Sequence, residues 1–329
     1  MKKFLLGSLL CLCLASLPSC RKYHHPGENC KGACQSYQTK FIKGSTNNTL
    51  EVLDWGGKGQ PILFLTGLGN TAHVFVDFAP KFTDKFHVYV MSRRGYGASE
   101  QTANGYGVDT LANDILAVTK ALQLNKVILI GHSIAGDEIS KFASSYPDRV
   151  DKVIYLDAAY DRTNLDSLNS HMPAFPEPTT QDLSSLESIK NFRAKTEGIS
   201  IPDEELKNQI VFSSDGSFQK LVTPEFIPAL ILKGVERPDY KNITCPALAI
   251  YAISGSVNQL FPFYPSLDAE NKKRADAYFR FYSNFAEEQG ETFKKEVKNG
   301  TVKVIKGGHH YVFISNPVET EKLIREFLK

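Results

Sequence analysis

The sequence predicts an α/β protein with a mostly parallel central sheet, helices on both faces and an inserted lid. Short, wholly apolar runs recur along the chain and alternate with helical stretches. Such runs are typical of parallel strands that helices bury on both faces. Several runs end in clusters of small and polar residues, and the carboxyl ends of parallel strands are where ligands bind. The 329 residues, 42% of them hydrophobic, suffice for one large domain with an insertion.

The first residues predict a targeting segment. Two lysines precede an apolar run, 4–17, that is short for a membrane helix. Leu-Pro-Ser-Cys at 17–20 is similar to a bacterial lipobox, in which Cys20 would be lipidated and become the new N-terminus. Pro18 is unusual in that motif, so ordinary signal cleavage stays open. We expect 1–19 to be a signal peptide and the mature chain to be a periplasmic, outer-membrane or cell-surface lipoprotein rather than a freely secreted protein.

Charge and cysteine content limit the partners and cofactors. The formal net charge is +2, and both surplus charges lie in the signal segment, so the rest of the chain is balanced. Phosphate binding needs a basic face, so we expect no nucleic-acid partner and membrane contact only through Cys20. Cys30 and Cys34 are close enough in sequence to form a disulfide in an exported chain, which would leave Cys245 free. The thiols lack the paired spacing of a zinc module, so we expect no metal and no cofactor.

The predicted elements follow a tether at residues 20–37. Two opening strands are expected within 38–56. Residues 110–122 predict a helix, because their apolar side chains recur on one face, and 318–328 predict the closing helix. Apolar runs predict further strands at 61–65, 86–91, 126–130, 152–156, 246–252 and 301–305.

The alternation of strands and helices breaks after the fourth apolar run. The chain there contains three prolines and then a polar helical stretch. We interpret residues 161–243 as a lid over the strand ends, inserted into a core made of 38–160 and 244–329. A second insertion, first aromatic and then charged and helical, is expected to reach about Gly300.

The run 126–130 leads directly into Gly-His-Ser-Ile-Ala-Gly at 131–136, and a helical stretch follows. A strand, a sharp turn and a helix form the setting of a nucleophile elbow, in which the neighbours of the nucleophile must be small. Ala135 stands where the G-x-S-x-G pattern has its last glycine, and a methyl group is a minor departure. Ser133 would occupy the bend with its hydroxyl above the sheet edge. The alternative is a plain Gly- and Ser-rich loop, since short motifs recur by chance.

A serine nucleophile needs a base, and the base needs an orienting carboxylate. His309 and His310 directly follow the last predicted strand. They give the chain order serine, acid, histidine. The alternative for either is a surface histidine in a Gly-rich loop.

Four segments together carry a family resemblance. In order and spacing they resemble the α/β-hydrolase fold superfamily, over about residues 38–329. The resemblance implies an esterase- or lipase-like serine hydrolase, here an exported, lipoprotein-like member. The segments are Gly67-Leu68-Gly69, Arg94-Gly95-Tyr96-Gly97-Ala98-Ser99, Gly131-His132-Ser133 and Gly308-His309-His310.

The resemblance also implies roles for individual residues. In this family the base usually lies seven residues before a proline that opens the final helix, and counting back from Pro317 gives His310, with His309 as the alternative. The oxyanion donors would be the backbone N–H groups of Leu68 and Ile134.

The position of the acid is inferred from the two positions at which relatives of this family carry it. Many carry it after the next-to-last strand, but residues 252–258 contain no carboxylate, and Asp268 lies well downstream. Other relatives carry it one strand earlier, where Asp157 ends a strand and Asp161 follows four residues later. We therefore expect Asp157 to be the acid, with Asp161 as the second choice.

These residues predict a hydrolase that works through an acyl-enzyme. Carboxylic esters or small lipids are the expected substrates, before amides, lactones or C–C bonds. A serine at the elbow disfavours epoxide hydrolysis and dehalogenation, whose relatives use aspartate there. Two alternatives stay open: a catalytically inactive binding lipoprotein, supported by the vacant acid position after the next-to-last strand, and cofactor-free peroxidation on the same triad. Arg93 and Arg94 are expected to make structural hydrogen bonds behind the strand ends.

Overall fold

The computed structural model describes residues 20–22, 36–163 and 165–329. The expected signal peptide and the Cys30–Cys34 pair lie outside the described residues, so both stay predictions, as does lipidation of Cys20. Within the described ranges, no helix is both long and apolar enough to cross a bilayer.

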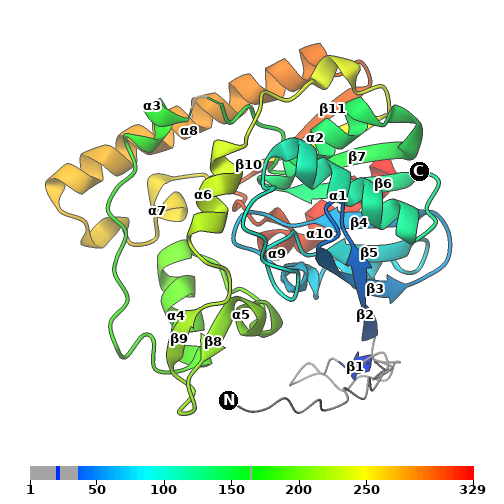
Figure 1. The fold of residues 1–329 in the computed structure, drawn as a ribbon. Helices are drawn as coiled ribbons and strands as arrows, with labels where there is room; N and C mark the ends of the chain where they lie inside the picture. The colour runs from blue at the N-terminus through cyan, green and yellow to red at the C-terminus, as the bar shows by residue number, and fades with distance from the viewer. Residues whose placement is uncertain (1–19, 23–35, 164) are drawn as a thin grey trace, which may run out of the picture.

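Nine strands form the main sheet, in the order β1-β2-β3-β5-β4-β6-β7-β10-β11 (Figure 1). The strands from β5 to β11 in this order run parallel, and β1, β2 and β3 are antiparallel to their neighbours. The predicted α/β class with a mostly parallel sheet is therefore confirmed. The strands are β1 (Cys20–Lys22), β2 (Ser36–Lys43), β3 (Thr49–Gly56), β4 (Pro61–Leu65), β5 (His87–Met91), β6 (Val127–His132), β7 (Val150–Leu156), β10 (Ala247–Ile253) and β11 (Gly300–Lys306).

The start of the chain differs from the expected tether. The short strand β1 pairs with the first residues of β2, with Cys20 opposite Gln38. Strand β2 therefore begins at Ser36, inside the range that the sequence suggested for a tether.

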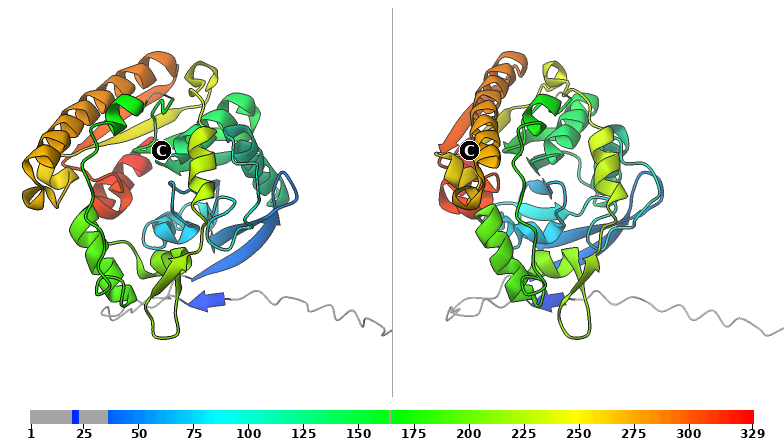
Figure 2. Two further views of the ribbon diagram at one scale, coloured as in Figure 1. Left: turned by 60° about the vertical axis from the view of Figure 1, so that its left-hand side comes forward. Right: turned by 90° about the vertical axis from the view of Figure 1, so that its left-hand side faces the viewer.

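Helices cover both faces of the sheet (Figures 1 and 2). One face packs against α1 (Val108–Ala121), α2 (Ala135–Ser145) and α8 (Ala269–Glu296), whose buried side chains include Ile115, Phe142 and Phe293. The other face carries Phe64, whose ring packs against Phe75 and Phe82. That second face is covered by η1 (Ala72–Phe75), η2 (Ala79–Phe82), α9 (Val312–Ser315) and α10 (Pro317–Phe327).

The chain between β7 and β10 adds no strand to the main sheet. Part of it packs around its own small core, which includes Ile189 and Leu206. A two-stranded sheet in this insertion was not expected from the sequence, although Asp215-Gly216 is a hairpin-turn signal and Gly216 has φ +85°. Its elements are α3 (Asp166–Asn169), α4 (Leu186–Glu197), α5 (Asp203–Gln209), β8 (Ile210–Phe212), β9 (Phe218–Leu221), α6 (Phe226–Lys233) and η4 (Tyr240–Asn242).

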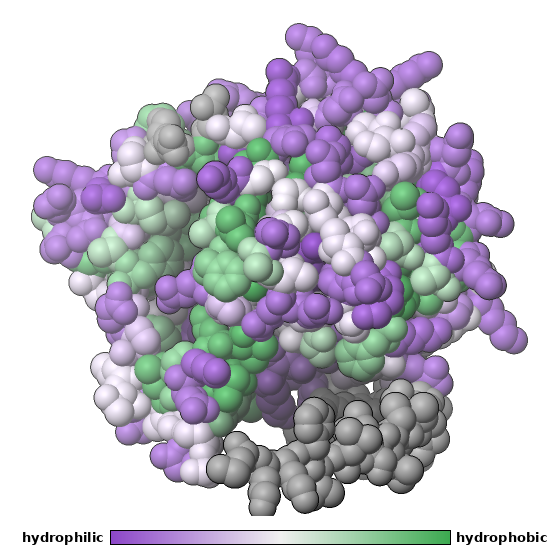
Figure 3. Space-filling model, in the orientation of Figure 1, coloured by the Kyte–Doolittle hydropathy of each residue, from purple (hydrophilic) through white to green (hydrophobic). Residues whose placement is uncertain are grey.

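The surface around the insertion is partly apolar. Figure 3 shows apolar side chains gathered over α6 and between α8 and the part that holds α4 and β9. Phe226 and Leu232 of α6 are both exposed. After β10, the short elements α7 (Val257–Leu260) and η5 (Tyr264–Ser266) lead into α8. The remaining short helix, η3 (Pro147–Arg149), precedes β7.

Candidate active site

The turn after β6 holds Ser133 in a left-handed conformation, with φ +55°. A non-glycine residue in this region costs of the order of 1–3 kcal/mol, so its surroundings must impose it. Tight packing does so: a Cβ on Gly136 would lie 1.9 Å from the Ala158 carbonyl oxygen, and one on Gly131 would lie 2.9 Å from Ile139 Cδ1. The small residues of the motif are thus required by close contacts, and the turn has the strained geometry of a nucleophile elbow.

Asp157 follows β7, also with a positive φ of +46°, and its side chain is completely buried. Its Oδ2 accepts a hydrogen bond from His310 Nδ1 at 2.6 Å. Because an ionised carboxylate can only accept, the proton lies on Nδ1 and Nε2 of the imidazole is free to act as a base.

Three further donors hold this carboxylate. The Tyr160 hydroxyl donates to Oδ1 at 2.5 Å, and the Ala252 N–H donates to the same atom at 3.0 Å. The Tyr282 hydroxyl of α8 reaches Oδ2 at 3.2 Å. The carboxylate that contacts His310 thus follows β7, one strand before the position that lacks a carboxylate, and a tyrosine from the second insertion donates to it.

The other sequence candidates lie elsewhere. His309 Nε2 lies 2.8 Å from the Glu197 carbonyl oxygen in the insertion, and burial lowers the pKa of its imidazole. Asp161 accepts hydrogen bonds from Thr163, and Asp268 caps α8. Among the described residues, none of these three side chains is bonded to His310.

His132 has a supporting position. Its buried ring packs between His310 and Tyr311, with both centroid distances at 4.7 Å. Its Nε2 lies 3.1 Å from the His310 carbonyl oxygen, and burial holds its pKa well below the usual value. The ring is therefore neutral and tethers the backbone of His310.

Ser133 and His310 line a common cavity of about 310 Å³, which we call the Ser133 cavity. Its walls come from the loop after β7, from α3, from α7 and from α8. Apart from His310, the ionisable side chains that line it in the described part of the chain are tyrosines and Arg162. The remaining lining residues are Tyr160, Arg162, Leu165, Leu168, Asn169, Leu260, Tyr278, Tyr282 and Phe285.

Leu68 and Ile134, whose backbone N–H groups are the expected oxyanion donors, pack in one small apolar cluster. Leu68 belongs to the loop after β4, and Ile134 immediately follows Ser133 at the start of α2. Among the described residues, neither backbone N–H donates a hydrogen bond.

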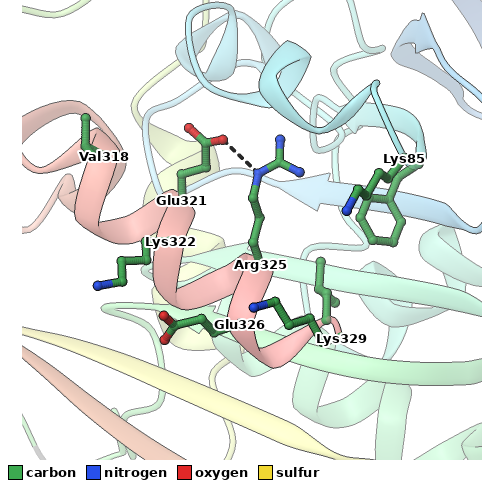
Figure 4. A pocket seen from close by; sticks show the side chains of 9 residues that line it. Lys85, Val318, Glu321, Lys322, Arg325, Glu326 and Lys329 are labelled. Carbon is green, nitrogen blue, oxygen red and sulfur yellow. Dashed lines mark hydrogen bonds and ion pairs between the residues drawn. The ribbon is translucent and has the colours of Figure 1, made fainter.

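Two other hollows lie at or near the surface. One of about 450 Å³ adjoins Leu68 and Tyr311 and is otherwise walled largely by the insertion; we call it the Leu68 hollow. The other, of about 490 Å³, runs along α10 and is rimmed by charged side chains, with Arg325 paired to Glu321 (Figure 4). Neither Ser133 nor His310 lines either hollow.

Glu205 of α5 is a buried carboxylate that the sequence did not single out. It accepts hydrogen bonds from the Thr71 N–H at 2.9 Å, the Thr71 hydroxyl, Asn70 Nδ2 at 3.1 Å and Gln209 Nε2 at 2.7 Å. Complete burial raises its pKa to about 7. Through these hydrogen bonds, Glu205 connects the insertion to the loop that carries Leu68.

Replacing this residue in Glu205→Gln should change how stability depends on pH. A raised folded-state pKa contributes stability that is present below pH 4.5 and is lost as pH rises through 7. The free energy of unfolding of the wild type, relative to the variant, should fall by about 3 kcal/mol over this window. Urea titrations at pH 4.5 and 8 measure it, and Glu204→Gln on the same helix is the matched control. Parallel pH profiles for wild type and Glu205→Gln would contradict the expectation.

Comparisons with known proteins agree with the fold. A family model described as alpha/beta hydrolase fold matches residues 60–192. The chain has the α/β-hydrolase fold. The crystal structure of E-2-(acetamidomethylene)succinate hydrolase superposes with a TM-score of 0.64 at 20% identity, covering 89% of this chain and 99% of that one. An esterase from Thermogutta terrifontis gives a TM-score of 0.58 at 20% identity, over 88% of this chain and 98% of that one.

Curated members of the superfamily match by sequence as well. The 2-(acetamidomethylene)succinate hydrolase of Mesorhizobium japonicum is 31% identical over 120 residues, 36% of this chain and 43% of that protein. A non-heme chloroperoxidase of Streptomyces lividans is 35% identical over 108 residues, 32% of this chain and 39% of that protein. These two matches span less than half of each relative. The human serine hydrolase-like protein 2 is 24% identical over 84% of this chain and 89% of its own length.

Proposed function

We propose that this α/β-hydrolase is a serine hydrolase that cleaves carboxylic esters through an acyl-enzyme. The observation that carries the proposal is the 2.6 Å contact between Asp157 and His310, together with the cavity that His310 and Ser133 both line. Sequence relatives and structural neighbours that are themselves hydrolases support it.

In the proposed reaction, Ser133 Oγ attacks the ester carbonyl carbon while His310 Nε2 takes the hydroxyl proton. The carbonyl oxygen becomes an oxyanion that accepts hydrogen bonds from the Leu68 and Ile134 N–H groups. The C–O bond to the alcohol then breaks, and His310 returns the proton to the leaving oxygen. Water, deprotonated by His310, attacks the acyl carbon, releases the acid and restores the serine hydroxyl.

The Ser133 cavity supports a compact, apolar and uncharged substrate group. Its volume is near the lower end of the range for ligand pockets, and leucine and aromatic side chains form most of its walls. Arg162 is already paired with Asp137 at 2.9 Å and donates hydrogen bonds to backbone carbonyl oxygens. We therefore propose esters with a short or compact acyl group as substrates.

A series of p-nitrophenyl esters from acetate to palmitate tests this proposal. We expect a burst of p-nitrophenol that reports acylation, and kcat/KM at least about tenfold higher for butyrate than for palmitate, because the cavity is small. A preference for palmitate would contradict the compact acyl group and favour the Leu68 hollow as its site. Binding of esters without turnover would instead favour an inactive binding protein, and halogenation with hydrogen peroxide would favour peroxidation.

A further inference from the structure

We propose that two buried arginines, Arg93 and Arg162, are positioning residues that aim the two oxyanion donors. The proposal rests on the serine-hydrolase function above. Each guanidinium donates to the carbonyl oxygen of the peptide unit whose N–H is one of the donors.

Arg93 holds the Leu68 donor. Its Nη1 donates to the Gly67 carbonyl oxygen at 3.2 Å, and its Nη2 donates to the Thr66 carbonyl oxygen at 2.7 Å. The Gly67 carbonyl and the Leu68 N–H belong to one peptide unit. Because a peptide unit is planar, fixing its carbonyl also fixes the direction of its N–H.

Arg162 holds the Ile134 donor in the same way. Its Nη2 donates to the Ser133 carbonyl oxygen at 2.8 Å, and that carbonyl shares a peptide unit with the Ile134 N–H. The same guanidinium also donates to the Ala158 carbonyl oxygen at 3.3 Å. Arg162 therefore links the turn at Ser133 to the segment that follows Asp157.

Neighbouring carboxylates at the start of α2 anchor both arginines. Glu138 Oε1 accepts from Arg93 Nε at 2.5 Å, and Asp137 Oδ1 accepts from Arg162 Nη1 at 2.9 Å. All four side chains are at most 9% exposed. Helix α2, which begins just after Ser133, thus carries the two carboxylates that pair with Arg93 and Arg162.

This arrangement has a direct catalytic consequence. Oxyanion donors act by being preorganised at the position that the charged oxygen takes in the transition state. A hydrogen bond to the carbonyl of a peptide also polarises its N–H, which makes it a better donor in a water-poor site. The hydrogen bonds from Arg93 and Arg162 to these carbonyl oxygens, which we call the clamps, should therefore stabilise the transition state more than the bound substrate.

Lysine substitutions test the clamps, since lysine keeps the charge but cannot form the planar fork. For Arg93→Lys and Arg162→Lys we expect kcat for p-nitrophenyl acetate to fall about 10- to 100-fold with KM changed less than about threefold. A trifluoromethyl ketone, which adds to a nucleophilic serine and leaves an oxyanion, should lose affinity by the same factor as kcat/KM.

Arg94→Lys is the matched control. Arg94 is equally buried and is paired with Asp114 through two hydrogen bonds of 2.7 Å, but it contacts residues 45–48 instead of an oxyanion peptide. Its substitution should lower the melting temperature and leave kcat within about threefold of the wild type. If either clamp variant fails to fold, Glu138→Gln or Asp137→Asn replaces it and should lower kcat in the same sense.

Several outcomes would overturn the clamp proposal while hydrolysis stands. These are clamp variants with wild-type kcat, an equal kcat loss in Arg94→Lys, or a rise in KM alone for Arg162→Lys, which would make Arg162 a substrate contact. A wild-type protein that hydrolyses no ester would overturn the proposed function itself, so the two failures are distinguishable.

Discussion

Ser133→Ala is expected to lower kcat for ester hydrolysis by about 10⁶-fold, to the level that binding and the oxyanion donors alone sustain. In the proposed reaction, the hydroxyl on the elbow is the protein group that bonds to the acyl carbon. Stopped-flow and steady-state assays with p-nitrophenyl acetate measure the loss, and the burst of p-nitrophenol should disappear with it.

The control for this substitution is a measurement of the melting temperature. The hydroxyl of Ser133 carries no hydrogen bond among the described residues that other parts of the fold depend on, so the melting temperature should stay near that of the wild type. A Ser133→Ala protein that is well folded and still turns over ester at more than about one hundredth of the wild-type rate would contradict nucleophilic catalysis by this residue.

Asp157→Asn is expected to lower kcat by about 10⁴-fold, because an amide facing His310 Nδ1 favours the tautomer that protonates Nε2 and so removes the base. The substitution keeps the shape of the side chain and an oxygen that can accept from Tyr160 and Ala252. Steady-state kinetics at pH 8 measures the effect on turnover separately from folding.

Asp161→Asn and Asp268→Asn are the matched controls for the acid. Asp161 is bonded to a neighbouring threonine and Asp268 caps a helix, so both variants should keep kcat within about threefold. Near-normal turnover in Asp157→Asn, or a large loss of turnover in Asp161→Asn, would show that a carboxylate other than Asp157 is the acid.

The elbow and the strands could be predicted because their signals are local. A wholly apolar strand followed by small residues can be recognised from consecutive positions in the sequence. Gly136 lies so close to a backbone oxygen that no side chain fits there. The interpretation of His310 as the base used its spacing from Pro317, which opens α10 in the structure. Both inferences depend on a few neighbouring residues.

The carboxylate that contacts His310 and the residues that support it depend on contacts between distant segments. Asp157 and His310 are 153 positions apart, in the segments that follow strands β7 and β11, and β10 separates these strands. Tyr282 reaches Asp157 and Glu205 reaches the loop that carries Leu68, each from an insertion where no periodic pattern or motif marks it. Arg93 was expected to be structural, and only its hydrogen-bond partners show that it contacts the peptide of Leu68.

Covalent labelling tests the central claim most directly. Wild-type protein is treated with a fluorophosphonate, digested and analysed by mass spectrometry, with Ser133→Ala and Asp157→Asn in parallel. We expect one phosphonyl adduct, on the peptide that contains Ser133, slow formation in Asp157→Asn and none in Ser133→Ala. An unlabelled wild type, or equal labelling of Ser133→Ala, would contradict a nucleophile at Ser133.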